Sequence, residues 1–338
     1  MKAIVKYAPG PESVECREVP VPDVPAGCIR LKTYAAAVCG TDLHILHDEY
    51  AHKEPVILGH EHVGVVDAAG EGVQGFEKGD TAVSLARVWV CGKCEYCKKG
   101  LFLLCPEGKS IGVGRDGAMA EYVIVPADKA FKVSGPPKKE YALFEPLVCC
   151  WRAVKAIARP EAGQCALVSG PGFMGQMTAQ ILRRCGVTVI MSGMPADEER
   201  LKQAGRVGAD YTCTSPEEIQ KTLDLLGLEG VQYSFECAGA KGSFANCLRF
   251  TKKLGIITQV GLYHGPIEVD VNGILYKEIQ LRTSYGADYT SFREMLEEQE
   301  REPFVLAPYI SSVYSLEQCR DAFADAASPA SYKVIFLP

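Results

Sequence analysis

The first 150 residues carry short, mostly apolar runs that turn-forming residues separate at close intervals. Such runs occupy 29–32, 63–66 and 81–85, while glycine and charged residues are frequent in 73–80. Short runs bounded by turn residues are typical of strands. We therefore expect residues 1–150 to form an antiparallel β domain.

The pattern changes near Glu145 and Pro146. Residues 147–159 place apolar side chains at helical spacing, and strand-like and helix-like segments alternate after Pro160. The expected strands are 165–169, 187–192, 232–237, 255–260 and 278–282. The expected helices are 174–185, 197–207, 217–226 and 242–251. Short strands separated by helices imply right-handed crossovers, so we expect 151–285 to be an α/β domain with a doubly wound parallel sheet.

The last segment, 286–338, carries two more helical patterns and a final strand at 332–336. We expect it to pack back on the first domain, so that 1–150 and 286–338 form one domain and 151–285 the other. The chain has 338 residues, of which 47% are hydrophobic and 23% charged, and this supplies enough apolar side chains for two cores.

The charge balance argues against two classes of partner. The formal net charge is −6, whereas a nucleic-acid binder is usually basic. The chain has no basic amphipathic stretch, no apolar run of about 18 residues, and no apolar segment behind Met1 that would indicate a signal peptide. We therefore expect a cytoplasmic protein that has neither a nucleic-acid nor a membrane partner.

Four of the 15 cysteines crowd into one short segment: Cys91, Cys94, Cys97 and Cys105. Cysteines three apart can wrap a single ion, and a longer loop then supplies the fourth thiolate that tetrahedral zinc requires. A site with four protein ligands leaves no place for water or substrate, so we expect a structural zinc ion here. A disulfide pair or an iron–sulfur cluster is the alternative interpretation.

A glycine-rich turn follows the expected strand 165–169 and opens the next helix. It reads Gly170, Pro171, Gly172, Phe173, Met174, Gly175. Between a strand and a helix, such glycines let backbone amides and the helix N-terminus approach a pyrophosphate. We expect this turn to bind a dinucleotide.

The end of the next strand leaves the choice between NAD and NADP open. Gly193 stands where an acidic residue would hold the ribose hydroxyls of NAD. Ser192 and Gly193 leave room for a 2′-phosphate, and Arg200 could pair with one. Acidic residues at 197–199 would repel that phosphate.

Several fragments occur in one characteristic order: 39–44 (CGTDLH), 59–64 (GHEHVG), 91–105, Glu145-Pro146 and 170–175. Together they resemble the zinc-dependent medium-chain dehydrogenases over essentially the whole chain. Within that family the sequence is most similar to the polyol (sorbitol-type) and threonine dehydrogenase branch. The resemblance implies a GroES-like, β-rich catalytic domain and a Rossmann cofactor domain.

The resemblance also implies a catalytic zinc site. Its ligands would be Cys39, His60 and Glu61, while Glu145 would either bind the zinc ion or hydrogen-bond its water. In the family, the positions of Thr41 and His44 form a proton relay. The expected reaction interconverts a secondary alcohol, such as a polyol or sugar derivative, and its ketone with NAD or NADP. Threonine-type amino-alcohol oxidation is the close alternative, and a non-catalytic zinc-ribbon module is a remote one.

By the same resemblance, further residues at strand ends would face the nicotinamide. These are Ala238, Val260, Gly261, Leu262, Ser284 and Tyr285. Tyr50, Arg115 and Tyr285 are candidate substrate-pocket residues. Relatives in the family are homodimers or homotetramers, so a homo-oligomer that acts on a small-molecule substrate is expected, with two zinc ions per chain.

Overall fold

The computed structural model describes residues 1–263 and 265–338. The chain divides into two compact units, which we describe separately. Unit 1 comprises Met1–Pro146 and Ala287–Pro338, and unit 2 comprises Leu147–Gly286. The chain therefore leaves unit 1 at Pro146 and returns to it at Ala287.

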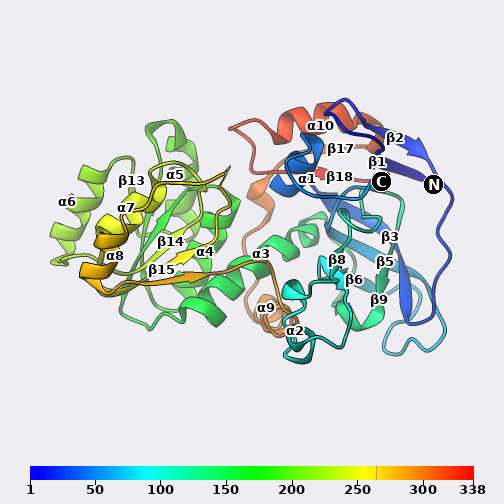
Figure 1. The fold of residues 1–338 in the computed structure, drawn as a ribbon, viewed down its shortest axis with the longest axis horizontal. Coiled ribbons are helices and arrows are strands. Elements are labelled where there is room, and N and C mark those ends of the chain that lie inside the picture. The colour runs from blue at the N-terminus through cyan, green and yellow to red at the C-terminus, as the bar shows by residue number, and fades with distance from the viewer. Residues whose placement is uncertain (264) are drawn as a thin grey trace. The chain divides into compact units, whose positions relative to one another are not determined.

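Unit 1 is built on a seven-stranded sheet in which β3 and β5 are the central pair (Figure 1). Six strands follow the order β10-β6-β5-β3-β18-β17, and β9 also pairs with β3. Their bounds are β3 Cys28–Ala37, β5 Glu61–Ala69, β6 Thr81–Ser84, β9 Tyr122–Pro126, β10 Ala130–Val133, β17 Ile310–Tyr314 and β18 Lys333–Phe336.

Two smaller sheets complete the strands of unit 1. One has the order β2-β1-β4 and the other pairs β7 with β8. Their bounds are β1 Lys2–Lys6, β2 Val14–Glu18, β4 Val56–Ile57, β7 Arg87–Trp89 and β8 Lys109–Ser110.

The helices of unit 1 are short, apart from α9. They are α1 Gly40–Leu46, α2 Glu95–Lys98, α9 Tyr289–Arg301 and α10 Cys319–Ala326, with α3 Phe144–Trp151 crossing into unit 2. Single 3-10 turns lie at Phe102–Leu104, Ala127–Lys129, Lys139–Leu143, Ala307–Tyr309 and Leu316–Gln318.

The C-terminal segment is part of the core of unit 1. Residues Ile335 and Phe336 of β18 pair antiparallel with Ala37 and Ala36 of β3. On α9, the ring of Phe292 stacks on Phe131 of β10 with 4.4 Å between centroids. Burial of such large aromatic side chains is a main source of stability, so the returning segment holds the sheet together at both places.

Unit 2 contains one six-stranded parallel sheet with the order β13-β12-β11-β14-β15-β16. This is the order of a doubly wound dinucleotide-binding sheet, in which the direction of winding reverses between the first and fourth strands, here β11 and β14. The strand bounds are β11 Cys165–Ser169, β12 Thr188–Ser192, β13 Tyr211–Cys213, β14 Val231–Glu236, β15 Thr251–Gln259 and β16 Gln280–Thr283.

Helices connect these strands and pack on the sheet (Figure 1). They are α4 Phe173–Arg184, α5 Glu198–Val207, α6 Pro216–Leu226, α7 Ser243–Phe250 and α8 Val271–Lys277, with a 3-10 turn at Pro195–Asp197. The predicted α/β fold with a β-rich domain and a parallel sheet is thus confirmed.

The structure differs from the sequence prediction at several elements after Pro146. The single helix expected over 147–159 is α-helical only to Trp151, and Arg152–Ala158 forms a π-helix. Apolar spacing of three to four residues does not distinguish these two helix types. Helix α8 and strands β13 and β17 were not predicted, because β13 has only three residues and neither α8 nor β17 contains a buried residue.

Among the described residues, no helix is both long enough and apolar enough to span a membrane.

Candidate active site

Cys39, His60 and Glu61 converge in unit 1. In the antiparallel pairing of β3 and β5, Ala37 lies opposite Glu61, so a residue just beyond β3 comes next to the start of β5. Cys39 is that residue, and it also caps helix α1. One ligand atom from each of the three side chains lies within 4.8 Å of the others.

Asp42 is a buried neighbour of this cluster that the sequence did not single out. Its carboxylate accepts hydrogen bonds from the backbone N–H of Cys39 at 2.8 Å and of Gly59 at 3.3 Å. Its Oδ1 lies 3.9 Å from Nδ1 of His60, a buried nitrogen with no hydrogen-bond partner. Asp42 therefore connects the backbone at Cys39 to the backbone at Gly59 and faces Nδ1 of His60.

Lys333 is the second buried neighbour that the sequence analysis missed. Its Nζ donates to both carboxylate oxygens of Glu61, at 2.5 and 2.7 Å, and both residues are buried. Burial lowers the pKa of Lys333, but the charges of Glu61, Cys39 and Glu145 more than offset this and raise it. A lysine in an otherwise apolar strand, SYKVIF, was the signal that could have revealed it.

The other predicted catalytic residues are distributed around the cluster. Thr41 lies on α1 with its Oγ1 3.7 Å from Sγ of Cys39. His44 lies one turn further along α1 and contacts Glu49 through Nδ1 at 2.8 Å. Glu145 is buried in the first turn of α3 and acts electrostatically on His60 and Lys333.

The charges of the cluster favour a bound cation. Burial lowers the pKa of His60, but Cys39, Asp42 and Glu145 hold it well above its ordinary value. Thiolate, imidazole and carboxylate are the ligand types that zinc prefers, and three protein ligands leave a position for water or substrate. This set of thiolate, imidazole and carboxylate donors fits a catalytic zinc ion.

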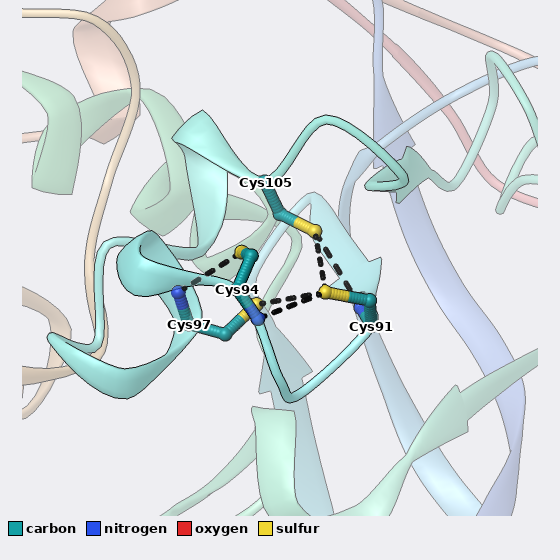
Figure 2. A group of neighbouring side chains, drawn as sticks. All are labelled: Cys91, Cys94, Cys97 and Cys105. Atoms are coloured by element: carbon teal, nitrogen blue, oxygen red, sulfur yellow. Dashed lines mark hydrogen bonds between the residues drawn. The ribbon is translucent and has the colours of Figure 1, made fainter.

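The four-cysteine segment forms a second group of ligands (Figure 2). Sγ of Cys91 lies 3.9 Å from Sγ of Cys97 and 3.7 Å from Sγ of Cys105. Tetrahedral zinc with bonds of ~2.3 Å places its sulfurs about 3.8 Å apart. The separations fit one ion held by four thiolates, and none of these four cysteines forms a disulfide.

Backbone amides support the thiolate form in this segment. The N–H of Cys94 points at Sγ of Cys91, and the N–H of Cys97 points at Sγ of Cys94, both at 3.4 Å. Backbone N–H groups of Lys93 and Cys94 lower the pKa of Cys91 to about 7. Burial instead raises the pKa of Cys97 to about 12. A thiolate, which zinc requires, thus has hydrogen-bond donors in place at Cys91.

Unit 2 contains a cavity of about 610 Å³ at the carboxyl ends of its strands. Ligands bind at such ends in doubly wound sheets, next to the point where the strand order reverses. Six of the predicted cofactor residues line it: Gly170, Gly172, Ser192, Gly193, Arg200 and Ala238. The sequence analysis missed other lining residues, including Met194, Thr214, Ser215, Lys241 and Asn246.

The glycines of the cofactor turn have different tasks. Gly170 has φ +104°, and a Cβ there would lie 2.8 Å from Ala238. A Cβ on Gly175 would meet the carbonyl oxygen of Gly170 at 1.9 Å, so this position packs α4 against the turn. Gly172 caps α4 and faces open space, where a phosphate could approach the amides of the first turn.

Eight of the predicted cofactor residues lie outside the cavity lining. Phe173 and Gly175 are buried in α4, next to Met174, whereas Leu262 and Tyr285 are 59% and 46% exposed. The N–H groups of Val260 and Gly261 both donate to the carbonyl oxygen of Glu236 at 2.9 Å. Ser284 accepts a hydrogen bond from Arg152 at 3.3 Å.

The candidate substrate residues Tyr50 and Arg115 both belong to unit 1, whereas Tyr285 belongs to unit 2. Arg115 lies over the ring of Trp89, 5.4 Å from its centroid, and lines a cavity that also contains Lys53 and Tyr122.

Comparison with known proteins agrees with this geometry. Residues 25–135 match the alcohol dehydrogenase GroES-like domain, and residues 174–301 match the zinc-binding dehydrogenase domain. A sorbitol dehydrogenase from Halalkalibacterium halodurans is 32% identical, over 100% of this chain and 99% of that protein. An L-threonine 3-dehydrogenase from Pyrococcus horikoshii is 36% identical, over 85% and 82% of the two chains.

A solved structure has the same fold. It is a putative zinc-binding dehydrogenase from Sinorhizobium meliloti bound to NADP, with a TM-score of 0.90, 29% identity and coverage of 100% of this chain and 99% of that chain. The two matched domains, the relatives that align over most of this chain and the two groups of candidate zinc ligands all indicate one family. The chain belongs to the zinc-dependent medium-chain dehydrogenase family.

Proposed function

We propose that the protein oxidises a secondary alcohol of a polyol or sugar derivative to the ketone, and catalyses the reverse reaction, with a nicotinamide cofactor. The observation that carries the proposal is the convergence of Cys39, His60 and Glu61 on one point beside a second buried carboxylate, Glu145. A sorbitol dehydrogenase related over its full length supports the polyol as substrate.

Cys39, His60 and Glu61 would hold the zinc ion in unit 1, and the cavity of unit 2 would hold the dinucleotide. When bound, zinc supplies the Lewis acidity that lowers the pKa of an alcohol, and the nicotinamide supplies the hydride acceptor. Asp42 orients His60, and Lys333 balances the charge of Glu61.

Thr41 and His44 provide a route for the proton that the alcohol loses. The two residues are three apart on α1, so their side chains share one face of the helix. The hydroxyl of Thr41 adjoins Cys39, and His44 is 25% exposed to solvent. Thr41 would accept the proton of the substrate hydroxyl as it passes its own hydroxyl proton on towards His44, and His44 would release a proton to water.

The four-cysteine segment would hold a second, structural zinc ion. Its four thiols leave no ligand position for a substrate. The ion would stabilise the 86–110 segment, whose own regular structure is limited to two-residue and three-residue strands and single helical turns.

A substrate panel tests the proposal. We expect the zinc-loaded protein to oxidise several polyols or sugar derivatives with a nicotinamide cofactor, and to be much less active on primary aliphatic alcohols. Activity confined to primary alcohols would contradict the polyol assignment.

L-Threonine belongs on the same panel as a second candidate substrate. The 36% identity to an L-threonine 3-dehydrogenase favours it, although that alignment covers 85% of this chain. If threonine has the highest kcat/KM on the panel, the amino-alcohol assignment replaces the polyol.

A matched pair of cysteine variants tests the catalytic cluster. We expect Cys39→Ser to abolish turnover while dinucleotide binding to unit 2 remains measurable. Cys16→Ser, on β2 and outside both ligand groups, should leave turnover unchanged. Substantial turnover in Cys39→Ser would show that this cysteine is not a zinc ligand.

We further propose that the protein is a cytoplasmic homo-oligomer. Strand β16 is an edge of the sheet in unit 2, and the adjacent α8 exposes Leu275 and Tyr276 by 65% and 76%. Unpaired edges and exposed apolar side chains are typical of interfaces between subunits. Light scattering should give a multimeric mass, and Leu275→Arg should reduce it; a monomeric mass for the unsubstituted protein would contradict the proposal.

A further inference from the structure

Asp197 lies at the position in the cofactor cavity where the sequence lacks an acidic residue. Strand β12 ends at Ser192, and Gly193 follows it without a side chain. Resting on the proposed function, we infer that Asp197 replaces the strand-end acid, holds the adenosine ribose hydroxyls, and makes the enzyme selective for NAD over NADP.

Asp197 lies close to the space that a side chain at position 193 would fill. A Cβ built on Gly193 would lie 3.1 Å from both Cβ and Oδ2 of Asp197. Both residues line the cavity together with Gly170 and Gly172 of the cofactor turn. The carboxylate of Asp197 therefore occupies the space that an acidic side chain at position 193 would use.

Local hydrogen bonding holds this carboxylate in place. Oδ2 of Asp197 accepts the backbone N–H of Met194 at 2.9 Å, which closes the 3-10 turn Pro195–Asp197. Gly193 is anchored in turn by its N–H, which donates to the carbonyl oxygen of Cys213 at 3.0 Å. Asp197 is thus a fixed hydrogen-bond acceptor, as recognition of two ribose hydroxyls requires.

The charge of Asp197 determines which ribose it accepts. A ribose with free hydroxyls offers O–H donors to the carboxylate, whereas a 2′-phosphate carries negative charge and would be repelled. The site would therefore reject NADP by repulsion as well as by losing a hydrogen bond.

Cations also lie near the turn. Arg200 and Lys241 line the same cavity, but residues 193–202 contain three carboxylates against two cations. Of those two cations, Lys202 pairs with Glu198 at 3.0 Å and with Glu199 at 2.8 Å. The charged residues that line the cavity itself are one carboxylate, Asp197, and two cations, Arg200 and Lys241, so the inferred selectivity rests on the position of Asp197 and not on the net charge of the turn.

Direct binding measurements on the full-length, zinc-loaded protein test the inference. We expect NAD to bind at least about tenfold more tightly than NADP, as loss of a charged hydrogen bond implies. Asp197→Asn keeps an oxygen for the N–H of Met194 but removes the charge, so it should weaken NAD binding and reduce the ratio about tenfold. Glu199→Gln, whose side chain is 84% exposed, is the control and should leave the ratio unchanged.

Two outcomes overturn the inference, and both are distinct from failure of the proposed function. The first is an unsubstituted protein that binds NADP as tightly as NAD. The second is an unchanged ratio in Asp197→Asn and in Asp197→Ser, with zinc content and melting temperature preserved. If neither dinucleotide binds, the proposed function itself is wrong.

Discussion

At the scale of single residues, the candidate zinc site depends on two charged neighbours that are not themselves ligands. Asp42 and Lys333 are both buried, and each faces one of the candidate ligands. A buried charge that loses its partner is strongly destabilising, whereas an exposed pair contributes little. The two neighbours therefore differ from the many surface ion pairs of this chain.

Lys333→Met should lower the free energy of unfolding by about 3 kcal/mol, because it leaves the buried carboxylate of Glu61 without its partner. Urea denaturation of the zinc-free protein, in which Lys333 is the cation that contacts Glu61, measures this. Lys333→Arg, which keeps the charge, should recover part of the loss. Lys2→Met removes an exposed pair with Glu317 and should leave the midpoint unchanged. An equal effect of the substitutions at 333 and 2 would contradict the prediction.

Asp42→Asn should weaken zinc binding by about 10- to 100-fold, as changes behind a metal-bound histidine commonly do. The carboxylate oxygens of Asp42 accept hydrogen bonds from two N–H groups and also face Nδ1 of His60. Asparagine has only one acceptor oxygen, so it cannot serve all three groups. Competition with a chromophoric chelator measures the affinity. Asp67→Asn, which affects an ion pair with Arg30 instead, is the control. Unchanged zinc affinity in Asp42→Asn would show that Asp42 does not support His60.

At the scale of elements, Glu236 connects the loops that follow β14 and β15 in unit 2. It is fully buried at the end of β14, and its Oε1 accepts from the N–H groups of Ala238 and Gly239 and from the hydroxyl of Ser243. Its Oε2 accepts from Nε2 of Gln259 at 2.5 Å. One carboxylate thus connects the ends of β14 and β15.

Glu236→Gln should destabilise the protein by about 1–3 kcal/mol, because the new amide N–H would face the donor of Gln259. The double substitution Glu236→Gln with Gln259→Glu restores a donor–acceptor pair and should recover part of the loss. Urea denaturation of the single and double variants measures the coupling. Additive losses would mean that the two side chains do not interact.

The four-cysteine segment leads to a prediction about metal content. Cys94→Ser should reduce the zinc content from two ions to one per chain, since a serine hydroxyl is a poor ligand for zinc. Elemental analysis measures this, with Cys28→Ser, outside both ligand groups, as the control. Two ions in Cys94→Ser would contradict the assignment of this segment as a zinc site.

The sequence predicted most of unit 2, because buried parallel strands alternate with amphipathic helices. The strand expected at 165–169 coincides with β11. Candidate ligands were recognisable because CGTDLH and GHEHVG are compact motifs. Lys333 was not predicted, because a lysine in an apolar strand does not reveal its partner, and Glu61 lies 272 positions away. The inferred role of Asp197 was not predicted either, because it depends on the conformation of the turn after Gly193.

At the scale of the whole molecule, the two units should respond to different ligands. Zinc would bind within Met1–Pro146, whereas the dinucleotide cavity lies within Leu147–Gly286. A bound ligand stabilises the structure that binds it.

Hydrogen exchange followed by mass spectrometry should show this division. Removal of zinc should increase exchange in 86–110 and leave 165–192 nearly unchanged. Added NAD should slow exchange in 169–176 and 192–200, where the cavity is lined. If hydrogen exchange changed equally over the whole chain in either experiment, the prediction that each unit responds to its own ligand would be wrong.

The pairing of Lys333 with Glu61 has a consequence for how the protein is made. The ribosome adds Lys333 272 residues after Glu61, which at ordinary rates of synthesis is a delay of tens of seconds. During that time the sheet of unit 1 lacks β18, and the carboxylate of Glu61 lacks its contact with Lys333. The metal centre near the start of the chain therefore reaches its final form only when some of the last-made residues arrive.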